Sequence, residues 1–227
     1  MHLRADFDKR AVVHPTDYQW VPSPMPGVER MMLDRVGEEK ARATSLVRYA
    51  PHSEFSPHRH GGGEEFLVLE GQFEDEHGVY PQGTYVRNPI GTQHQPRIGE
   101  AGATIFVKLR QFETEYTRPC VIQTHDVPWR KGLIKNLEAI PLHTFGTEQV
   151  SLVKWAPHTQ FERHQHFGGE EILVLTGAIY DEYGSYPAGS WLRNPHQSHH
   201  APFTQSEGAV IYLKKGHLLN PLKHGMP

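Results

Sequence analysis

Cysteine is almost absent from this chain, and long apolar runs and an excess of basic residues are missing as well. The single cysteine, Cys120, excludes a disulfide framework and a thiolate zinc site within one chain. A net charge of −3 with mixed signs gives no basic stripe, so we expect no direct binding to nucleic acid. No apolar run approaches the length of a membrane span, and the charged N-terminus has no apolar signal core. We therefore expect no membrane partner and a location in the reducing cytoplasm.

Histidine, by contrast, is abundant, with 17 in 227 residues, and its spacing indicates a metal site. His58 and His60 are two positions apart, so in a strand their imidazoles share one face. Three glycines follow and allow a tight turn that brings the carboxylate of Glu64 to the same point. A strand that begins near Gly83 ends in a Pro/Gly turn and delivers a third imidazole, that of His94. These four side chains are the first predicted set of metal ligands.

The same set recurs 106 positions later, as His164, His166, Glu170 and His200. The two copies align without a gap from Ser45 and Ser151 to at least Lys108 and Lys214, and about half of the aligned positions are identical. A period of this length exceeds that of solenoid repeats and indicates a tandem duplication of one small domain. Each copy, of about 100 residues, is long enough to bury its own core.

The expected organisation has five parts: an N-terminal arm at 1–27, a first domain at 28–118, a linker at 119–132, a second domain at 133–217 and a C-terminal tail at 218–227. Three prolines between Trp20 and Gly27 exclude a helix interior or a central strand there. We expect Tyr18 and Trp20 to pack against a barrel wall, and the tail to be loosely ordered.

Short apolar runs alternate with Pro, Gly and Asn turn signals in the first copy and predict strands at 30–36, 44–50, 65–70, 84–86 and 103–109. No window holds a helical apolar period. This pattern predicts an all-β fold, a sandwich or a jelly-roll barrel. Alternation along the strand places Phe66 and Val68 on the same inner face as Glu64, and Ile172 and Val174 correspond to them in the second copy.

The two histidine sets resemble the motifs of the cupin superfamily. The first motif, H-x-H-x(3,4)-E-x(6)-G, is matched twice, by His58, His60, Glu64 and Gly71 and by His164, His166, Glu170 and Gly177. The second motif, G-x(5)-P-x-G-x(2)-H, is matched by Gly83, Pro89, Gly91 and His94. In the second copy Gln197 stands where the motif has its glycine. The resemblance implies a bicupin, that is, tandem double-stranded β-helix (jelly-roll) barrels.

The flanking sequence, His-x-Gly-Gly-Glu-Glu-x-Leu-Val-Leu-x-Gly and then Asp-Glu and Arg-Asn-Pro, is similar to the cupin domain of ChrR-type anti-sigma factors, over almost the whole chain. This similarity implies a regulatory metalloprotein that responds to a small ligand or to redox state. ChrR holds its sigma factor through a separate zinc-binding Cys/His domain. Cys120 alone cannot supply such a domain, so we expect no sigma-factor binding by this chain alone.

The same cupin subfamily also resembles dioxygenases that cleave a carbon-carbon bond of small diketones or hydroxyketones, so an Fe(II)-type dioxygenase is the alternative. Glu64 and Glu170 would then be the catalytic residues that accept or release a proton. A structural or storage bicupin is a weaker third hypothesis, because it would not need two full ligand sets.

Imidazole and carboxylate ligands suit Zn, Fe, Mn or Ni and exclude Ca and Mg more firmly than they select among transition metals. We expect two divalent ions per chain, of a metal left open by the sequence, each with free positions for a small-molecule ligand or O2. A homodimer also stays open.

Several neighbouring residues have a structural interpretation that competes with a functional one. Glu65 and Glu171 should face away from the ligands as surface or interdomain polar groups, unless a bulged turn makes Glu65 the ligand. Arg87 and Arg193 fit strand-end salt bridges, whereas His52 and His158 fit either turns or a shell around the metal.

The second copy differs from the first around its ligands. Phe167 replaces a glycine, and His196 and His199 occur there alone, with His199 expected to point away from His200. Because Phe167 and Gln197 should narrow the second site, we expect ligand binding or turnover to depend mainly on the first set.

Overall fold

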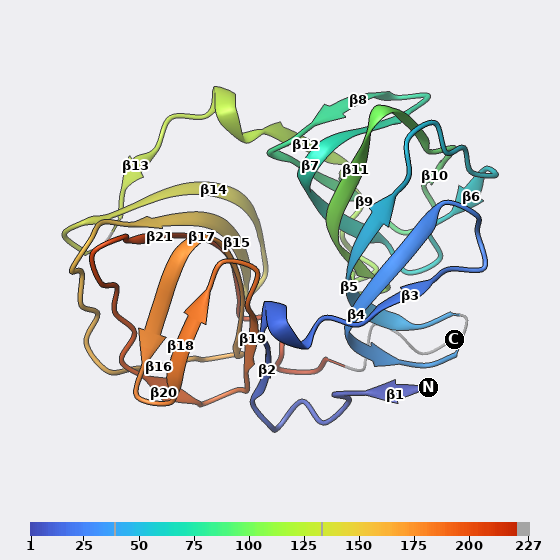
Figure 1. The fold of residues 1–227 in the computed structure, drawn as a ribbon. Coiled ribbons are helices and arrows are strands. Elements are labelled where there is room, and N and C mark those ends of the chain that lie inside the picture. The colour runs from blue at the N-terminus through green and yellow to red at the C-terminus, as the bar shows by residue number, and fades with distance from the viewer. Residues whose placement is uncertain (39, 133, 222–227) are drawn as a thin grey trace. The chain divides into compact units, whose positions relative to one another are not determined.

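The computed structural model describes residues 1–38, 40–132 and 134–221, which form two compact units (Figure 1). The described residues of one unit are 1–5, 19–38 and 40–126, and those of the other are 6–18, 127–132 and 134–221. Apart from single 3-10 turns at Pro15–Asp17 (η1) and Thr124–Asp126 (η2), the described secondary structure consists of β strands. Among the described residues no helix is long and apolar enough to cross a bilayer.

The first unit is built on a nine-stranded antiparallel sheet. Its strands follow the order β1 (His2–Leu3), β4 (Val28–Val36), β5 (Arg42–Tyr49), β11 (Arg97–Leu109), β7 (Glu64–Asp75), β9 (Thr84–Asn88) and β12 (Cys120–Gln123). Two further strands join its sides, β3 (Trp20–Pro22) beside β4 and β8 (Gly78–Pro81) beside β7. A separate short pair consists of β6 (His58–Arg59) and β10 (Gln93–His94). The five strands predicted for this copy are confirmed, with β7 and β11 longer than expected.

The second unit repeats this plan in an eight-stranded sheet. The order is β13 (Arg130–Lys131), β14 (Leu137–Phe145), β15 (Glu148–Trp155), β21 (Ala209–Lys215), β17 (Glu170–Asp181), β19 (Trp191–Asn194) and β2 (Ala11–Val13). Beside β17 lies β18 (Gly184–Pro187), and the short pair is β16 (His164–Gln165) with β20 (His199–His200). Both units are jelly-roll barrels, so the predicted all-β tandem fold is confirmed.

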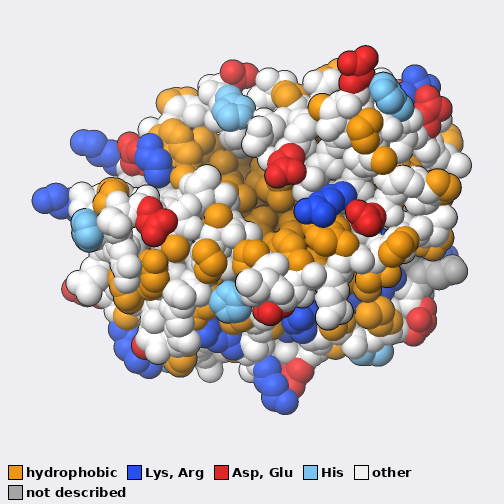
Figure 2. Space-filling view, viewed as in Figure 1, with side chains coloured by type: hydrophobic (Ala, Val, Ile, Leu, Met, Phe, Trp, Pro, Cys, Tyr) orange, Lys and Arg blue, Asp and Glu red, His pale blue; other side chains and the backbone are white. Residues whose placement is uncertain are grey.

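Each barrel is filled by the inward-facing side chains of its long strands. Phe66 and Val68 are 1% exposed and belong to the core of the first unit, as the alternation along β7 predicts. Ile172 and Val174 occupy the corresponding places in the second core. On the face shown in Figure 2, acidic and basic side chains are scattered among one another, in keeping with the mixed charge of the sequence.

The glycine that ends each histidine motif has a steric reason. Gly71 and Gly177 both have a φ of +68° and lie in the long strands β7 and β17. A Cβ atom there would lie 2.1 Å from the backbone oxygen of Gly102 or Gly208. The close approach of two backbones in each unit therefore requires glycine at this point of the motif.

The expected arm and linker contain strands that the sequence analysis missed. The arm contributes β2, which pairs with β19 of the second unit, and the 119–132 linker contributes β12, which pairs with β9 of the first. Each is three or four residues long and close to prolines, so its pairing comes from the sheet that receives it rather than from a local signal. The expected domain boundaries themselves stay predictions, and of the tail, residues 222–227 lie outside the described residues.

The two aromatic residues of the arm do pack as expected, each in its own unit. Tyr18 donates its hydroxyl hydrogen to the backbone oxygen of Gly189 in the second unit. Trp20 lies in the first unit, where the Arg48 guanidinium stands 3.7 Å from the centre of the indole ring. The described start of the tail is ordered as well, because Leu218 is 4% exposed.

Candidate metal centres

The first histidine set converges where β6 and β10 pair. The two strands place His58 directly opposite His94, and the two Nε2 atoms lie 3.1 Å apart. His60 follows β6 immediately, and its ring centre is 5.1 Å from that of His58 and 4.7 Å from that of His94. One nitrogen from each ring can be chosen such that all three lie within 4.8 Å of one another. The expected sharing of one face by His58 and His60 is thus seen.

Glu64, the first residue of β7, lies beside this group of three imidazoles. Its Oε2 atom is 3.4 Å from Nε2 of His60 and 3.7 Å from Nε2 of His94. The Asn88 amide on β9 donates a hydrogen bond of 3.1 Å to the same oxygen. The carboxylate is therefore held in place and reaches two of the three rings closely.

The second set is more compact than the first. Here one ligand atom from each of four residues lies within 4.8 Å of all the others, and the four are His164, His166, Glu170 and His200. The Glu170 oxygens are 3.5 Å from a nitrogen of His166 and 3.5 Å from Nε2 of His200. Asn194 on β19 donates a 3.0 Å hydrogen bond to Glu170, as Asn88 does to its counterpart.

Hydrogen bonds on the outer side of the rings determine which nitrogen faces each cluster. Nδ1 of His58 lies 3.2 Å from the Ser56 carbonyl oxygen, and Nδ1 of His164 lies 2.9 Å from that of Glu162. A carbonyl oxygen only accepts, so both Nδ1 atoms carry the hydrogen. Nε2 of each ring is then directed into its cluster, the arrangement typical of a metal-binding histidine.

His94 and His200 have a carboxylate as their outer partner. Nδ1 of His94 is 3.0 Å from Oδ2 of Asp75, and Nδ1 of His200 is 3.2 Å from Oδ2 of Asp181. Burial raises the pKa of both carboxyls, but hydrogen bonds from the histidines and from nearby backbone and tyrosine donors outweigh it, so both pKa values are lowered. Each aspartate is therefore an ionised acceptor that fixes the ring and raises its basicity.

Buried nitrogens that make no hydrogen bond indicate that both clusters suit a cation. Among the described side chains, His60 and His200 each bury an Nε2 atom that makes no hydrogen bond. Burial also lowers the pKa of His60 and lowers that of His166 to about 4, so these rings stay neutral and can ligate. Three nitrogens and a carboxylate fit a divalent transition metal, whereas Ca and Mg prefer all-oxygen sets.

The comparisons with known proteins agree with this geometry. The ChrR cupin-like domain family matches the chain twice, over residues 8–113 and 117–219. The chain belongs to this family. No curated protein matches it in sequence. The predicted resemblance to the ChrR-type cupins is confirmed.

Solved structures with the same fold are distant from this cupin in sequence. A proposed dioxygenase from Nostoc punctiforme superposes with a TM-score of 0.75 at 14% identity, covering 96% of this chain and 86% of that one. A proposed glyoxylate-induced protein from Pseudomonas aeruginosa gives 0.72 at 15% identity, with 90% and 87% covered. The oxalate decarboxylase of Lactobacillus farciminis, in complex with formate, gives 0.64 at 10% identity, with 91% and 86% covered. At these identities the likeness establishes the cupin fold alone.

The glutamates that follow the candidate ligands face away from the clusters but are not surface groups. Glu65 is 1% exposed and forms a 2.7 Å salt bridge with Arg87, which confirms the strand-end bridge expected for that arginine. Glu171 is fully buried and accepts a 2.8 Å hydrogen bond from the Trp191 indole. The surface alternative for both glutamates is wrong, because the side of the sheet opposite the barrel core is itself buried. Arg193 donates to the backbone oxygen of Asp6.

The other histidines near the ligand sets take structural places. His52 and His158 are exposed turn residues with φ values of +60° and +55°. His199 is exposed and precedes His200 in β20, so alternation along the strand assigns the two side chains to opposite faces. His196 accepts a hydrogen bond from the Gly168 amide, and the exposed Phe167 ring lies 5.3 Å from it.

The aspartates and asparagines that hold the candidate ligands were not singled out from the sequence. Their signal was present, because Asp75 and Asp181, like Asn88 and Asn194, recur at the same offset as the histidines. A further contact, from Arg10 to Asp181, has no such signal, since Arg10 lies outside the aligned repeat.

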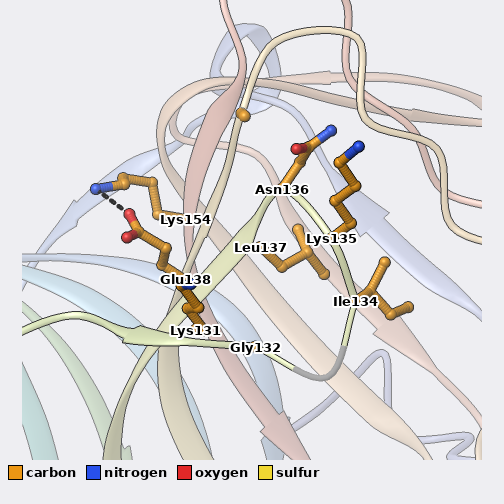
Figure 3. A pocket seen from close by; sticks show the side chains of 9 residues that line it. Lys131, Gly132, Ile134, Lys135, Asn136, Leu137, Glu138 and Lys154 are labelled. Atoms are coloured by element: carbon orange, nitrogen blue, oxygen red, sulfur yellow. Dashed lines mark ion pairs between the residues drawn. The ribbon is translucent and has the colours of Figure 1, made fainter.

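A shallow pocket of about 390 Å³ lies elsewhere in the second unit (Figure 3). It is lined by the turn between β13 and β14 and by Lys154, which forms an ion pair with Glu138. None of the eight candidate ligands lines it.

Proposed function

We propose that this cupin binds one divalent transition-metal ion at each histidine cluster and serves as a regulatory metalloprotein that responds to a small ligand or to redox state. The observation that carries the proposal is the convergence of three imidazoles in both units, with outer hydrogen bonds that direct ring nitrogens inward. Both the binding of one ion per unit and the response to a ligand or to redox state are proposed.

The surroundings of both clusters favour the binding of a small ligand at the metal centre. His58 is exposed and His164 is half-buried, whereas the other candidate ligands are buried, so each centre meets solvent at one corner. On the inner side Phe73 lies 5.9 Å from the His94 ring and belongs to the packed core. A bound transition metal would supply Lewis acidity or a redox couple. The chain itself orients the metal-binding side chains, through Asp75 in the first unit, and excludes water from the side of the centre that faces the barrel core.

A dioxygenase acting on a small diketone or hydroxyketone is the second candidate function. It is favoured by the position of Glu64, which lies beside the three imidazoles and could accept a proton from a substrate. Glu170 would take this role in the second unit. One structural neighbour is itself a proposed dioxygenase, which supports the idea only at the level of fold.

Elemental analysis of untagged protein, loaded with metal under anaerobic conditions, tests the main proposal. We expect about two ions per chain in the wild type, and about one after His58→Ala with His60→Ala or after His164→Ala with His166→Ala. His199→Ala is the matched control, because this exposed histidine adjoins His200 but is not one of the four candidate ligands. Absence of metal in the loaded wild type would refute the proposal, as would a loss of metal in the control equal to that in the paired variants.

Oxygen uptake separates the two functions. If the Fe(II)-loaded protein consumes O2 with small diketones, and Glu64→Gln abolishes the uptake while metal content is kept, the chain is an enzyme. If it consumes none, but a small oxygen ligand or oxidation shifts the stability or spectrum of the metal-loaded protein, the regulatory proposal is supported. We also propose that the chain alone forms no stable complex with a sigma factor, which gel filtration of the mixture would check.

A further inference from the structure

Arg10, from the N-terminal segment, reaches the outer side of the second metal cluster. Its Nη2 atom donates to Oδ2 of Asp181 at 2.9 Å and to the Tyr186 hydroxyl at 2.6 Å. Its Nε atom donates to Oδ1 of Asn194 at 2.9 Å. The guanidinium also lies 4.7 Å from the centre of the Tyr183 ring. One planar group is thus bound to three polar partners, a geometry that arginine supplies and lysine cannot.

Two of these partners are the groups that hold the candidate ligands. Asp181 accepts the hydrogen of His200 on the same Oδ2 atom that Arg10 contacts. Asn194 donates through Nδ2 to Glu170, and the bond from Arg10 to its Oδ1 fixes which end of the amide faces that carboxylate. Arg10 therefore acts on one nitrogen ligand and one oxygen ligand through one intermediary each.

The first cluster offers an internal comparison, because it has the same intermediaries, and no arginine contacts them among the described residues. Asp75 and Asn88 hold His94 and Glu64 there. The strand that closes this sheet, β12, pairs Cys120 with Arg87, as β2 pairs Ala11 with Arg193. The residue before β12 is Pro119, which has no side-chain donor, whereas the residue before β2 is Arg10. The cluster with the arginine is the one in which all four ligand atoms lie within 4.8 Å of one another.

We propose that Arg10 is a positioning residue of the second metal centre and that it couples metal binding there to the docking of residues 6–18. The inference rests on the proposed metal binding. By aligning Asp181 and Asn194 before an ion arrives, Arg10 lowers the cost of organising the ligands. Coupling between two binding events is reciprocal, so an ion in the second centre must also stabilise the docked segment.

The test is carried out on chains that keep only one centre. With His58→Ala and His60→Ala in place, Co(II) titration monitored by visible absorption reports the affinity and coordination of the second centre alone. We expect Arg10→Met to weaken Co(II) binding by about three- to tenfold, below the effect of about tenfold or more for removing a group that touches a ligand directly, and to change the Co(II) spectrum. The control is Lys9→Met, because Lys9 is an exposed neighbour whose side chain pairs with Asp6 away from the cluster, and it should change affinity less than twofold.

Arg10→Lys keeps the charge and guards against a failure of Arg10→Met to fold. It should also weaken binding, because an ammonium group cannot reach Asp181 and Asn194 in the same way. Hydrogen exchange of residues 11–13 should slow on Co(II) binding in the parent chain and respond less in either variant. In a chain that carries His164→Ala and His166→Ala instead, Arg10→Met should not change the Co(II) affinity of the first centre.

The possible failures are distinguishable. If the second centre binds Co(II) equally well with and without Arg10, the inference is overturned and the metal proposal stands. Equal weakening of both centres would also overturn it, since that would be a general loss of stability. If the parent chain binds no Co(II), the metal proposal falls and this inference falls with it.

Discussion

Replacing Gly177 by alanine should destabilise the second unit far more than replacing Gly146 in the same unit. Both glycines have a left-handed backbone, with φ values of +68° and +55°. A new Cβ atom at Gly177 would lie 2.1 Å from the Gly208 backbone oxygen, whereas one at Gly146 would meet nothing within 4 Å. The pair of variants therefore separates the conformational cost from the steric one.

The magnitude follows from these two contributions. Forcing alanine into the left-handed region costs about 1–2 kcal/mol, and both variants pay it. Both also gain equally from a stiffer unfolded chain. Only Gly177→Ala must move two backbones apart by about 1 Å, because carbon and oxygen atoms normally stay more than 3 Å apart. We expect a loss of about 1–2 kcal/mol for Gly146→Ala and at least about 2 kcal/mol more for Gly177→Ala, a large value for a single substitution.

Urea denaturation of the metal-free protein, followed by tryptophan fluorescence, measures the difference. Trp155 and Trp191 are buried in the second unit and report its unfolding. In thermal melts of a unit of about 100 residues, the extra 2 kcal/mol corresponds to a further fall of about 8–16 °C. If Gly177→Ala proves no more harmful than Gly146→Ala, the close backbone approach is not what requires glycine at the end of the motif.

Saturating metal should raise the unfolding midpoint, because each occupied centre adds about 2.7 kcal/mol to the free energy of unfolding at 100 times its Kd; a melting curve unchanged by excess Zn(II), Mn(II) and Fe(II) would contradict this. Glu64→Gln should reduce small-ligand binding or O2 uptake more than Glu170→Gln, because the sequence predicts that Phe167 narrows access to the second centre; the reverse ranking, at equal metal content, would show that the bulkier turn does not limit access. Arg87→Met should lower the free energy of unfolding by about 3–5 kcal/mol in urea titrations, since it leaves the buried Glu65 carboxylate without its salt bridge, and Glu65→Leu added to it should restore most of the loss.

The sequence contained enough to predict the jelly-roll class and the two ligand clusters, because both depend on local periodicity. His58 and His60 share a face through strand alternation alone, and the second copy repeats the pattern in register. The burial of Glu65 could not be foreseen in this way. Alternation predicts the face on which a side chain lies, but not whether further chain covers that face.

The strands β2 and β12 escaped prediction for a different reason. A three-residue strand such as Ala11–Val13 has too few side chains to show a period, and its pairing with β19 spans most of the chain. The role of Arg10 was not predicted either, because its partners Asp181 and Asn194 lie more than 170 positions away in the sequence. Long-range placement of this kind becomes visible only in the folded protein.

The exchange of β2 and β12 bears on how such a chain could have arisen. The family match to the first repeat begins before β2, yet β2 completes the sheet of the second unit. The family match to the second repeat begins before β12, yet β12 completes the sheet of the first unit. A protein made of a single repeat would contain one such leading strand and one sheet that lacks its last strand. Two copies could complete each other's sheets by exchanging these strands, as in a domain-swapped dimer. Gene duplication would then have joined the two molecules of such a dimer into one chain. A single repeat expressed alone should therefore dimerise and obtain its missing strand from the second molecule.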